Sequence, residues 1–228
     1  MKYTLIIPCG GIGERVGAEI PKQYIEVHGK SILNWTLSKF KNFDNIHQLL
    51  IPADDNYIEE IEASIPIEFK DIYEITPHGK TRFNSIYNSI KHISPESDYV
   101  MIHDAVRPFV THNLIEKLMT AVQKYNGVVP YLHPTDTIKA IDNDKKETYI
   151  YETIDREVLA SVQTPQIFEK NLYVKAYEYS NRNRFKGTDD SSILEYSKFL
   201  PKLIIGEMQN LKITTEIDIE IAKIVFKK

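Results

Sequence analysis

The stretch IIPCGGIGERVGAEIPKQ, residues 6–23, begins like a buried strand and then places four glycines within eight positions. Glycine has no β-carbon, so a glycine-rich turn lets the backbone come close to a ligand and point its N–H groups at it. Arg15 and Lys22 lie within and just after this turn. The stretch therefore predicts a phosphate-binding loop that follows the first strand, with two cations beside it.

Three nucleotide-binding templates and a plain turn compete for this loop. A P-loop requires GxxxxGK followed by Ser or Thr, which the stretch lacks. A dinucleotide fingerprint requires GxGxxG, whereas Gly11, Gly13 and Gly17 are spaced one residue too far, and Pro21 stands where a long helix would continue. A nucleotidyltransferase loop, in which cations grip a nucleoside triphosphate, fits both the glycines and the cations. The stretch alone also allows a plain turn with two solvated cations.

The composition is that of an ordinary folded protein. The chain has 228 residues, of which 42% are hydrophobic and 26% are charged. Its formal charge of −4 disfavours a protein that follows nucleic acid by overall electrostatics. Cys9 is the single cysteine, which excludes an intrachain disulfide framework and fits a reducing compartment. No apolar run reaches the roughly 18 residues of a membrane span. We expect a cytoplasmic protein with no membrane or nucleic-acid partner.

Short β-rich runs alternate with amphipathic helical patterns along most of the chain. This alternation is typical of βαβ units around a mostly parallel sheet, so the predicted fold class is α/β, as a single domain over residues 1–228. Strands are predicted at residues 3–8, 48–52, 99–103, 127–132 and 200–205, and helices at residues 31–43, 54–64, 80–93, 113–125, 170–180 and 188–196, with a last helix that begins near residue 215.

The pattern changes between residues 137 and 162, where IKAID, the charged turn NDKKE and TYIYETI follow one another. Two β-rich runs around a charged turn predict a β-hairpin that projects from the main fold. A two-stranded hairpin is only marginally stable in water, so one that persists usually packs on something else. We expect residues 137–162 to form an arm that packs on a second copy of the chain.

A carboxylate and a guanidinium follow the strand predicted at residues 99–103. The sequence VMIHDAVRPF, residues 100–109, places Asp104 directly after an apolar run and Arg107 three residues later. Ligands of open α/β sheets bind beyond the carboxyl ends of the strands, so both side chains face the same crevice as the glycine loop. Asp104 could hold a ribose hydroxyl or a magnesium ion and Arg107 a phosphate, or the two could form an ion pair that closes the loop. His103 is interpreted as a structural core residue.

Four further segments place hydroxyl groups and charges near chain reversals. They are TDTIK at residues 135–139, DREVLASVQTPQIF at 155–168, GTDDSSILE at 187–195 and NLKITTEIDIEIA at 210–222. The simplest interpretation of the third is a helix N-cap, and the fourth resembles a capping box that runs from Thr215 to Asp218. Taken alone, Lys212 in the fourth segment is a surface lysine.

The ordered set of segments resembles the methylerythritol phosphate cytidylyltransferase family of isoprenoid synthesis. The matching pieces, which span residues 7–215, are IPCGGIGERV with PKQY, HGKTRFNS, HDAVRP, DTIK, DREVLASVQTPQIF, TDDSSILE and NLKITT. The related ribitol phosphate cytidylyltransferases share the glycine loop, HDAVRP and TPQ. Lys139 within DTIK and the TDDSS run ahead of Glu195 favour the first family.

The resemblance implies a Rossmann-like α/β domain with a mostly parallel sheet, whose β-hairpin arm, residues 137–162, clasps a second subunit so that the homodimer completes its active sites. The implied catalytic cations around the triphosphate are Arg15, Lys22 and Lys212. The implied nucleotide contacts are Pro8, Cys9, Gly10, Gly11, Gly13, Gly79, Arg82, Ser85, Asp104 and Ala105, with Mg²⁺ held mainly by the CTP phosphates and by Asp104. The implied acceptor contacts are Arg107, Thr137, Arg156, Thr164 and Thr188.

The implied reaction joins CTP to 2-C-methyl-D-erythritol 4-phosphate and releases pyrophosphate. A phosphate monoester is already an anionic nucleophile at neutral pH, so positioning and charge neutralisation would carry the reaction without a strong general base. The residues leave three alternatives open. They are a ribitol 5-phosphate cytidylyltransferase that makes CDP-ribitol, a dinucleotide-dependent oxidoreductase and a non-catalytic nucleotide-binding scaffold.

Overall fold

The first strand is apolar on both of its faces. In the computed structural model, which describes residues 1–10, 20–142 and 148–227, Leu5 and Ile6 of β1 (Tyr3–Ile6) are both fully buried. Leu5 belongs to one hydrophobic core and Ile6 to another. Because successive side chains of a strand point to opposite faces of the sheet, the two cores lie on opposite sides of one sheet.

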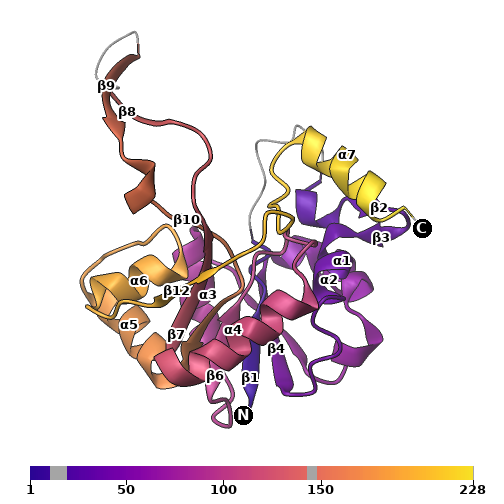
Figure 1. Ribbon diagram of the computed structural model, residues 1–228. Helices are drawn as coiled ribbons and strands as arrows, with labels where there is room; N and C mark the ends of the chain where they lie inside the picture. The colour runs from indigo at the N-terminus through magenta and orange to yellow at the C-terminus, as the bar shows by residue number, and fades with distance from the viewer. Residues whose placement is uncertain (11–19, 143–147, 228) are drawn as a thin grey trace.

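Strands and helices alternate along the first half of the chain, and a group of antiparallel strands follows (Figure 1). The further strands are β2 (Glu26–Val27), β3 (Lys30–Ser31), β4 (Ile46–Ala53), β5 (Tyr73–Pro77), β6 (Tyr99–Ile102), β7 (Gly127–Leu132), β8 (Ile138–Asp142), β9 (Tyr149–Ile154), β10 (Ser161–Val162), β11 (Gln166–Glu169) and β12 (Lys202–Ile205). The α-helices are α1 (Ile32–Leu37), α2 (Ile58–Ser64), α3 (Arg82–Ile90), α4 (His112–Tyr125), α5 (Lys170–Arg182), α6 (Asp190–Tyr196) and α7 (Glu216–Val225). Short 3-10 turns cover Lys22–Tyr24, Asp55–Tyr57, Ile67–Phe69 and Arg156–Val158.

A mixed, mostly parallel sheet of eight strands forms the centre of the described part of the chain. Its strand order is β10, β7, β11, β6, β1, β4, β5, and β12 pairs with β7 beside this path. The pairs of β1 with β4 and β6, of β4 with β5 and of β7 with β12 are parallel. Strand β11 runs antiparallel between β6 and β7. The carboxyl ends of β1, β4 and β6 therefore lie at one edge of the sheet.

Helices cover both faces of the sheet. Leu33 of α1, Ile61 of α2 and Leu118 of α4 join the core that contains Leu5. The second core is covered by α3, α5 and α6, with Ile86, Tyr177 and Leu194 among its buried side chains. A smaller third core packs α7 against β2 and α1. None of the helices in the described ranges is long and apolar enough to cross a membrane.

The predicted α/β class and the order of the predicted elements are confirmed, with differences at the element ends. The helix predicted at residues 31–43 ends at Leu37, and turns continue the segment. Helix α3 begins at Arg82 rather than at Lys80, because the Thr81 hydroxyl caps it by accepting from the Asn84 N–H. Strands β2, β3, β5, β10 and β11 were not among the predicted elements. Of these, β11 lies between β6 and β7 in the central sheet. It has four residues and directly follows Pro165, so it offers little periodicity to detect.

Two helix starts follow the predicted capping chemistry. Thr215 caps α7 and forms a capping box with Asp218, which confirms the interpretation of that segment. Asp189 caps α6 and forms a capping box with Ser192, so the GTDDSSILE segment does start a helix. Both helices therefore begin where side chains satisfy the first free backbone N–H groups.

Strands β8 and β9 form a separate antiparallel pair, which projects away from the main sheet in Figure 1. Ile138 pairs with Ile154 at its base. Ile150 and Tyr151, which are neighbours on β9 and so point to opposite faces, are 67% and 75% exposed. The charged turn, residues 143–147, lies outside the described residues. The role of residues 137–162 as a dimerisation arm stays a prediction.

Removal of a core side chain should destabilise the fold. Leu118 of α4 is fully buried, so Leu118→Ala is expected to lower the free energy of unfolding by about 2–5 kcal/mol through lost burial and a residual cavity. Urea unfolding followed by circular dichroism measures this value. Ile224→Ala, at an exposed position of α7, is the control and should change the free energy by less than about 1 kcal/mol. Equal effects of the two variants would contradict this view of the core.

Candidate active site

Asp104 lies just beyond the carboxyl end of β6 and binds two cations. Its Oδ2 is 3.2 Å from Arg107 Nε and 3.0 Å from Lys212 Nζ, and its side chain is 13% exposed. Burial raises the pKa of Asp104, but attraction to Lys212, Arg82 and Arg107 outweighs burial and holds the pKa well below its usual value. The carboxylate is therefore ionised at neutral pH. Ala105, which follows it, is buried.

Lys212 reaches this carboxylate from the segment between β12 and α7. The segment is held at two points, because Ile213 N–H donates to the Val106 carbonyl oxygen at 2.8 Å and Arg107 Nη1 donates to the Asn210 carbonyl oxygen at 2.9 Å. The Lys212 side chain is still 43% exposed. A lysine that is an ordinary surface residue by sequence alone is thus placed at the end of β6, where it remains accessible to a ligand.

His103 and Thr164 support the Asp104 loop. Thr164 Oγ1 accepts from Asp104 N–H at 3.1 Å and lies 2.9 Å from His103 Nδ1, while His103 Nε2 lies 3.1 Å from the Arg107 carbonyl oxygen. A carbonyl only accepts, so the assigned tautomer carries its proton on Nε2, and the Thr164 hydroxyl donates to Nδ1. Burial lowers the pKa of His103 to about 4. The structural interpretation of His103 is confirmed.

Gln163 and Asn210 join the Lys212 segment to the connection between β10 and β11, which carries Thr164. Gln163 Nε2 donates to the Glu207 carbonyl oxygen at 2.8 Å, and Asn210 Nδ2 donates to the Thr164 carbonyl oxygen at 2.8 Å. Both side chains are buried. Buried amide groups must be hydrogen-bonded, so these contacts fix where the segment can lie. Sequence reasoning did not single out either residue.

The loop after β1 meets the turn before α3. A β-carbon on Gly10 would lie 3.0 Å from His78 Cβ and 3.5 Å from Ser85 Oγ. A β-carbon on Gly79 would lie 2.3 Å from Asn84 Cβ, which is too close for any other residue type. Ser85 Oγ in turn accepts from Gly79 N–H at 3.0 Å. Three of the predicted nucleotide contacts, Gly10, Gly79 and Ser85, are thus in one place, and close packing requires glycine at position 79.

The two ends of the glycine loop are joined. Cys9 is buried, donates its N–H to the Pro52 carbonyl oxygen at 2.9 Å and accepts from Gln23 Nε2 at 2.7 Å. Burial raises the pKa of the Cys9 thiol, which is therefore neutral. Lys22, next to Gln23, and Pro8, next to Cys9, are both partly buried. The predicted residues Gly11, Gly13 and Arg15 lie outside the described residues.

Arg82 contacts a carboxylate that sequence reasoning interpreted only as part of a helix cap. Its Nη2 lies 2.6 Å from Asp190 Oδ2, and Asp190 is fully buried. Burial lowers the pKa of Arg82, but the attraction of Asp190 and Asp104 outweighs burial and raises it above its usual value. The TDDSS run did not predict this contact, because helix N-capping already explains an acidic residue at a helix start.

The predicted acceptor residues are not all in one place. Arg107 and Thr164 contact Asp104 or its loop. Arg156 is exposed and donates through Nη1 to the Thr135 carbonyl oxygen at 2.6 Å, and Thr137 and Thr188 are exposed too. Among the described hydrogen bonds, none joins these three exposed side chains to Asp104.

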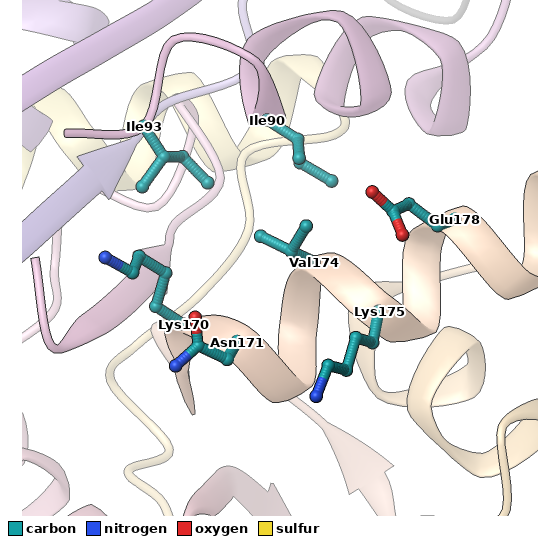
Figure 2. A pocket seen from close by; sticks show the side chains of 7 residues that line it. All are labelled: Ile90, Ile93, Lys170, Asn171, Val174, Lys175 and Glu178. Atoms are coloured by element: carbon teal, nitrogen blue, oxygen red, sulfur yellow. The ribbon is translucent and has the colours of Figure 1, made fainter. Parts of the chain in front are cut away.

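A surface cavity of about 460 Å³ lies between α3 and α5 (Figure 2). Apolar Ile90, Ile93 and Val174 line it together with Lys170, Asn171, Lys175 and Glu178. None of these is a residue that the sequence marks for a ligand. The candidate active site is therefore defined by the hydrogen bonds around Asp104 and by the glycine turns, and not by this cavity.

Asp104 could serve as a cation ligand. Within residues 1–10, 20–142 and 148–227, no group of three or more His, Cys, Asp or Glu side chains could hold a metal ion. Asp104 alone offers an ionised, nearly buried carboxylate at the site. Mg²⁺ is usually bound by one or two carboxylates, substrate phosphates and water. The residues present thus fit a cation that a bound triphosphate would help to hold.

An α/β sheet that places glycine turns, an ionised carboxylate and several cations beyond its carboxyl ends is typical of a nucleotide-dependent transferase. Comparison with known proteins identifies the family of transferases. The chain belongs to the IspD family, 2-C-methyl-D-erythritol 4-phosphate cytidylyltransferase, whose family model matches residues 3–228.

Individual relatives agree with the family model. The chain is 35% identical over 229 residues to the 2-C-methyl-D-erythritol 4-phosphate cytidylyltransferase of Clostridium botulinum (strain Langeland), covering 100% of this chain and 98% of the relative. It is 35% identical over 225 residues to that of Clostridioides difficile (strain 630), covering 97% and 92%. The crystal structure of 4-diphosphocytidyl-2C-methyl-D-erythritol synthase from Anaerococcus prevotii aligns with a TM-score of 0.83 at 30% identity, covering 100% of this chain and 96% of that one.

These similarities confirm the resemblance and show that the protein is an enzyme of the nucleotidyltransferase class. The alternatives of an oxidoreductase and a non-catalytic scaffold are wrong. Between the two cytidylyltransferases, the family favours the methylerythritol phosphate enzyme over the ribitol phosphate enzyme.

The neutral, buried His103 should make the fold less stable in acid. Its pKa is about 4 in the folded chain and 6.5 ordinarily, so the unfolded chain binds more protons between these values. Stability that is complete above about pH 6.5 is then lost as the pH falls towards 4. Between pH 7 and pH 5 this histidine alone should cost about 2 kcal/mol.

Urea unfolding at both pH values measures that loss, with His103→Gln as the comparison. The free energy of unfolding of the variant should fall by about 2 kcal/mol less over the same interval. Equal falls in the two proteins would show that His103 does not titrate as its burial requires.

Proposed function

We propose that this chain transfers the cytidylyl group of CTP to 2-C-methyl-D-erythritol 4-phosphate, giving 4-diphosphocytidyl-2-C-methyl-D-erythritol and pyrophosphate. The observation that carries the proposal is the meeting of Lys212 and Arg107 at the Asp104 carboxylate, at the same edge of the sheet as Gly10, where the glycine loop starts after β1. The relatives that carry this enzyme's name match the chain over its full length.

The glycine turns fit the nucleotide. Gly10 and Gly79 lack side chains where the loop after β1 and the turn before α3 come within contact of each other. Their backbone groups and the Ser85 hydroxyl would contact the cytosine, while Asp104 and Ala105 would lie near the ribose. Arg15, which lies outside the described residues, and Lys22 would bind the triphosphate, as the family resemblance implies.

In the proposed reaction an oxygen of the acceptor phosphate attacks the α-phosphorus of CTP in line. A phosphorus–oxygen bond forms there as the bond to the bridging oxygen breaks, and that electron pair leaves with pyrophosphate. The acceptor is anionic at neutral pH, so no residue needs to remove a proton. Arg15, Lys22 and Lys212 would neutralise the charge that develops on the transferring and leaving groups.

We propose that a divalent cation, Mg²⁺, takes part. When bound, it would supply further charge neutralisation at the triphosphate. Asp104 is the residue that would hold it, because its carboxylate is ionised and lies next to the cations that would bind the same phosphates. The acceptor phosphate would lie near Arg107 and Thr164.

We further propose that residues 1–228 act as a single nucleotidyltransferase domain in a cytoplasmic homodimer joined through residues 137–162. Strand β9 is exposed on both faces, although it carries Ile150 and Tyr151. Apolar side chains on both faces of a solitary hairpin call for a covering surface. In such a dimer Thr137 and Arg156 would reach the acceptor in the partner's site, which agrees with the lack of a described hydrogen bond between either side chain and Asp104 in their own chain.

Loss of one phosphate-binding cation should slow the reaction strongly. Lys212→Ala is expected to lower kcat by about 10²–10³, because a preorganised charge aimed at the transition state is lost. Lys22→Ala and Arg15→Ala should act similarly. Pyrophosphate release from CTP, Mg²⁺ and 2-C-methyl-D-erythritol 4-phosphate measures the rate.

Lys202→Ala is the matched control, because this lysine of β12 lies over the Tyr125 ring instead of at Asp104. It should retain normal turnover. Near-normal turnover of Lys212→Ala in a folded protein would refute the assignment. Ribitol 5-phosphate as the acceptor tests the substrate, since faster release with it would overturn the proposed acceptor.

The arm should control assembly. Ile150→Asp combined with Tyr151→Asp is expected to weaken a dimer about 100-fold, because buried anchor residues dominate interface energies. Sedimentation velocity over a concentration series measures the change. Ile67→Asp, at an isoleucine that is 80% exposed outside the arm, should leave assembly unchanged. A double variant that remains as dimeric as the parent protein would contradict the role of the arm.

A further inference from the structure

A buried carboxylate, that of Asp190, lies at the start of α6 and contacts Arg82 in the first turn of α3. Asp190 Oδ1 accepts from the hydroxyls of Tyr173 and Tyr177, both at 2.7 Å, and its Oδ2 accepts from Arg82 Nη2 at 2.6 Å. Asp190 and both tyrosines are fully buried. Burial raises the pKa of each tyrosine well above its usual value, so both hydroxyls keep their protons and act as donors. The carboxylate thus has a complete set of partners.

Net stability alone does not explain this buried ion pair. A buried ion pair gives little net stability, and apolar residues of similar volume often do as well or better. Such a pair does fix geometry, because each partner has few other places to satisfy its charge. What Asp190 fixes is Arg82, which comes from a different helix and lies 108 positions earlier in the chain.

Arg82 is the one member of this group that is partly exposed. Its side chain is 30% exposed. Its Nη2 donates the hydrogen bond to Asp190. Arg82 lies in the first turn of α3, between Gly79 and Ser85 in the chain. A β-carbon on Gly10 would contact Ser85 in this same turn. A guanidinium has N–H donors on more than one edge, so an edge remains to face a ligand at this turn.

The charges around Arg82 decide which half of the nucleotide it suits. Asp190 compensates its charge at contact distance, and Asp104 attracts it as well. Because the Asp190 carboxylate lies in contact with the guanidinium, this ion pair adds no net positive charge for a triphosphate. It remains a rigid hydrogen-bond donor, which suits the neutral polar edges of the base and ribose.

We propose that Asp190, together with Tyr173 and Tyr177, is a positioning residue that holds Arg82 against the nucleoside half of CTP. The inference rests on the proposed function, since it concerns how the same site takes its nucleotide. A side chain that is already fixed loses little conformational freedom when the nucleotide binds, so loss of the anchor weakens nucleotide binding although Arg82 itself is retained.

The test is the kinetics of Asp190→Asn with CTP and 2-C-methyl-D-erythritol 4-phosphate. The KM for CTP and the inhibition constant of CMP should both rise about 10- to 100-fold, the usual effect of losing a hydrogen bond between charged groups. The KM for the acceptor and inhibition by pyrophosphate should change by less than about twofold. A purely structural role would not separate CMP from pyrophosphate.

Two comparisons keep the test independent of folding. Tyr177→Phe removes one donor to Asp190 and should give a smaller rise in the same two constants. In an Arg82→Ala background, Asp190→Asn should add less than about twofold, because the residue acts through Arg82. Leu118→Ala, which weakens a core away from this group, should leave both constants unchanged.

An active parent enzyme whose Asp190→Asn and Tyr177→Phe variants bind CTP and CMP normally would overturn this inference alone. So would an undiminished effect of Asp190→Asn in the Arg82→Ala background. A parent protein that releases no pyrophosphate from CTP with the acceptor would instead overturn the proposed function.

Discussion

The site depends on the ion pairs between the Asp104 carboxylate and the cations around it. A carboxylate that is 13% exposed must be compensated, because an unpaired charge at such burial is costly. Compensation comes from Arg107, three residues away, and from Lys212, far along the chain. The need to pair one charge thus brings the segment after β12 to the carboxyl end of β6. From there the chain continues into α7, which packs against β2 and α1.

Lys212 could turn towards a triphosphate without leaving this carboxylate unpaired. Asp104 would still be held by Arg107 and attracted by Arg82, so its charge would not be left unpaired. Lys212 itself is 43% exposed, so its ammonium group stays accessible to a ligand. The same lysine can therefore neutralise a triphosphate in the proposed reaction without disrupting the loop. Arg107 is less free to move, because it also donates to the Asn210 carbonyl oxygen.

Much of the fold was predictable because periodicity reports on burial. Helix α4 places Leu114, Leu118 and Val122 on one buried face, and the strand predicted at residues 127–132 agrees with β7. Elements that depend on tertiary partners were not predictable in this way. Strand β11 pairs with β6 and β7 on either side, yet its four residues after Pro165 show no distinctive pattern.

The site shows the same division between local and distant contacts. Asp104 and Arg107 were predictable, since a short spacing after an apolar strand places both beyond its carboxyl end. The contacts of Gln163 and Asn210 join segments that no local pattern relates. Asp189 and Asp190 are the clearest case, because both occupy the start of one helix and either could have been its cap. Only packing distinguishes them: Asp189 faces the free N–H groups of α6, whereas Asp190 points into the core towards two tyrosine hydroxyls and Arg82. A sequence pattern that is fully explained by local chemistry can therefore conceal a residue whose contacts are determined by the tertiary fold.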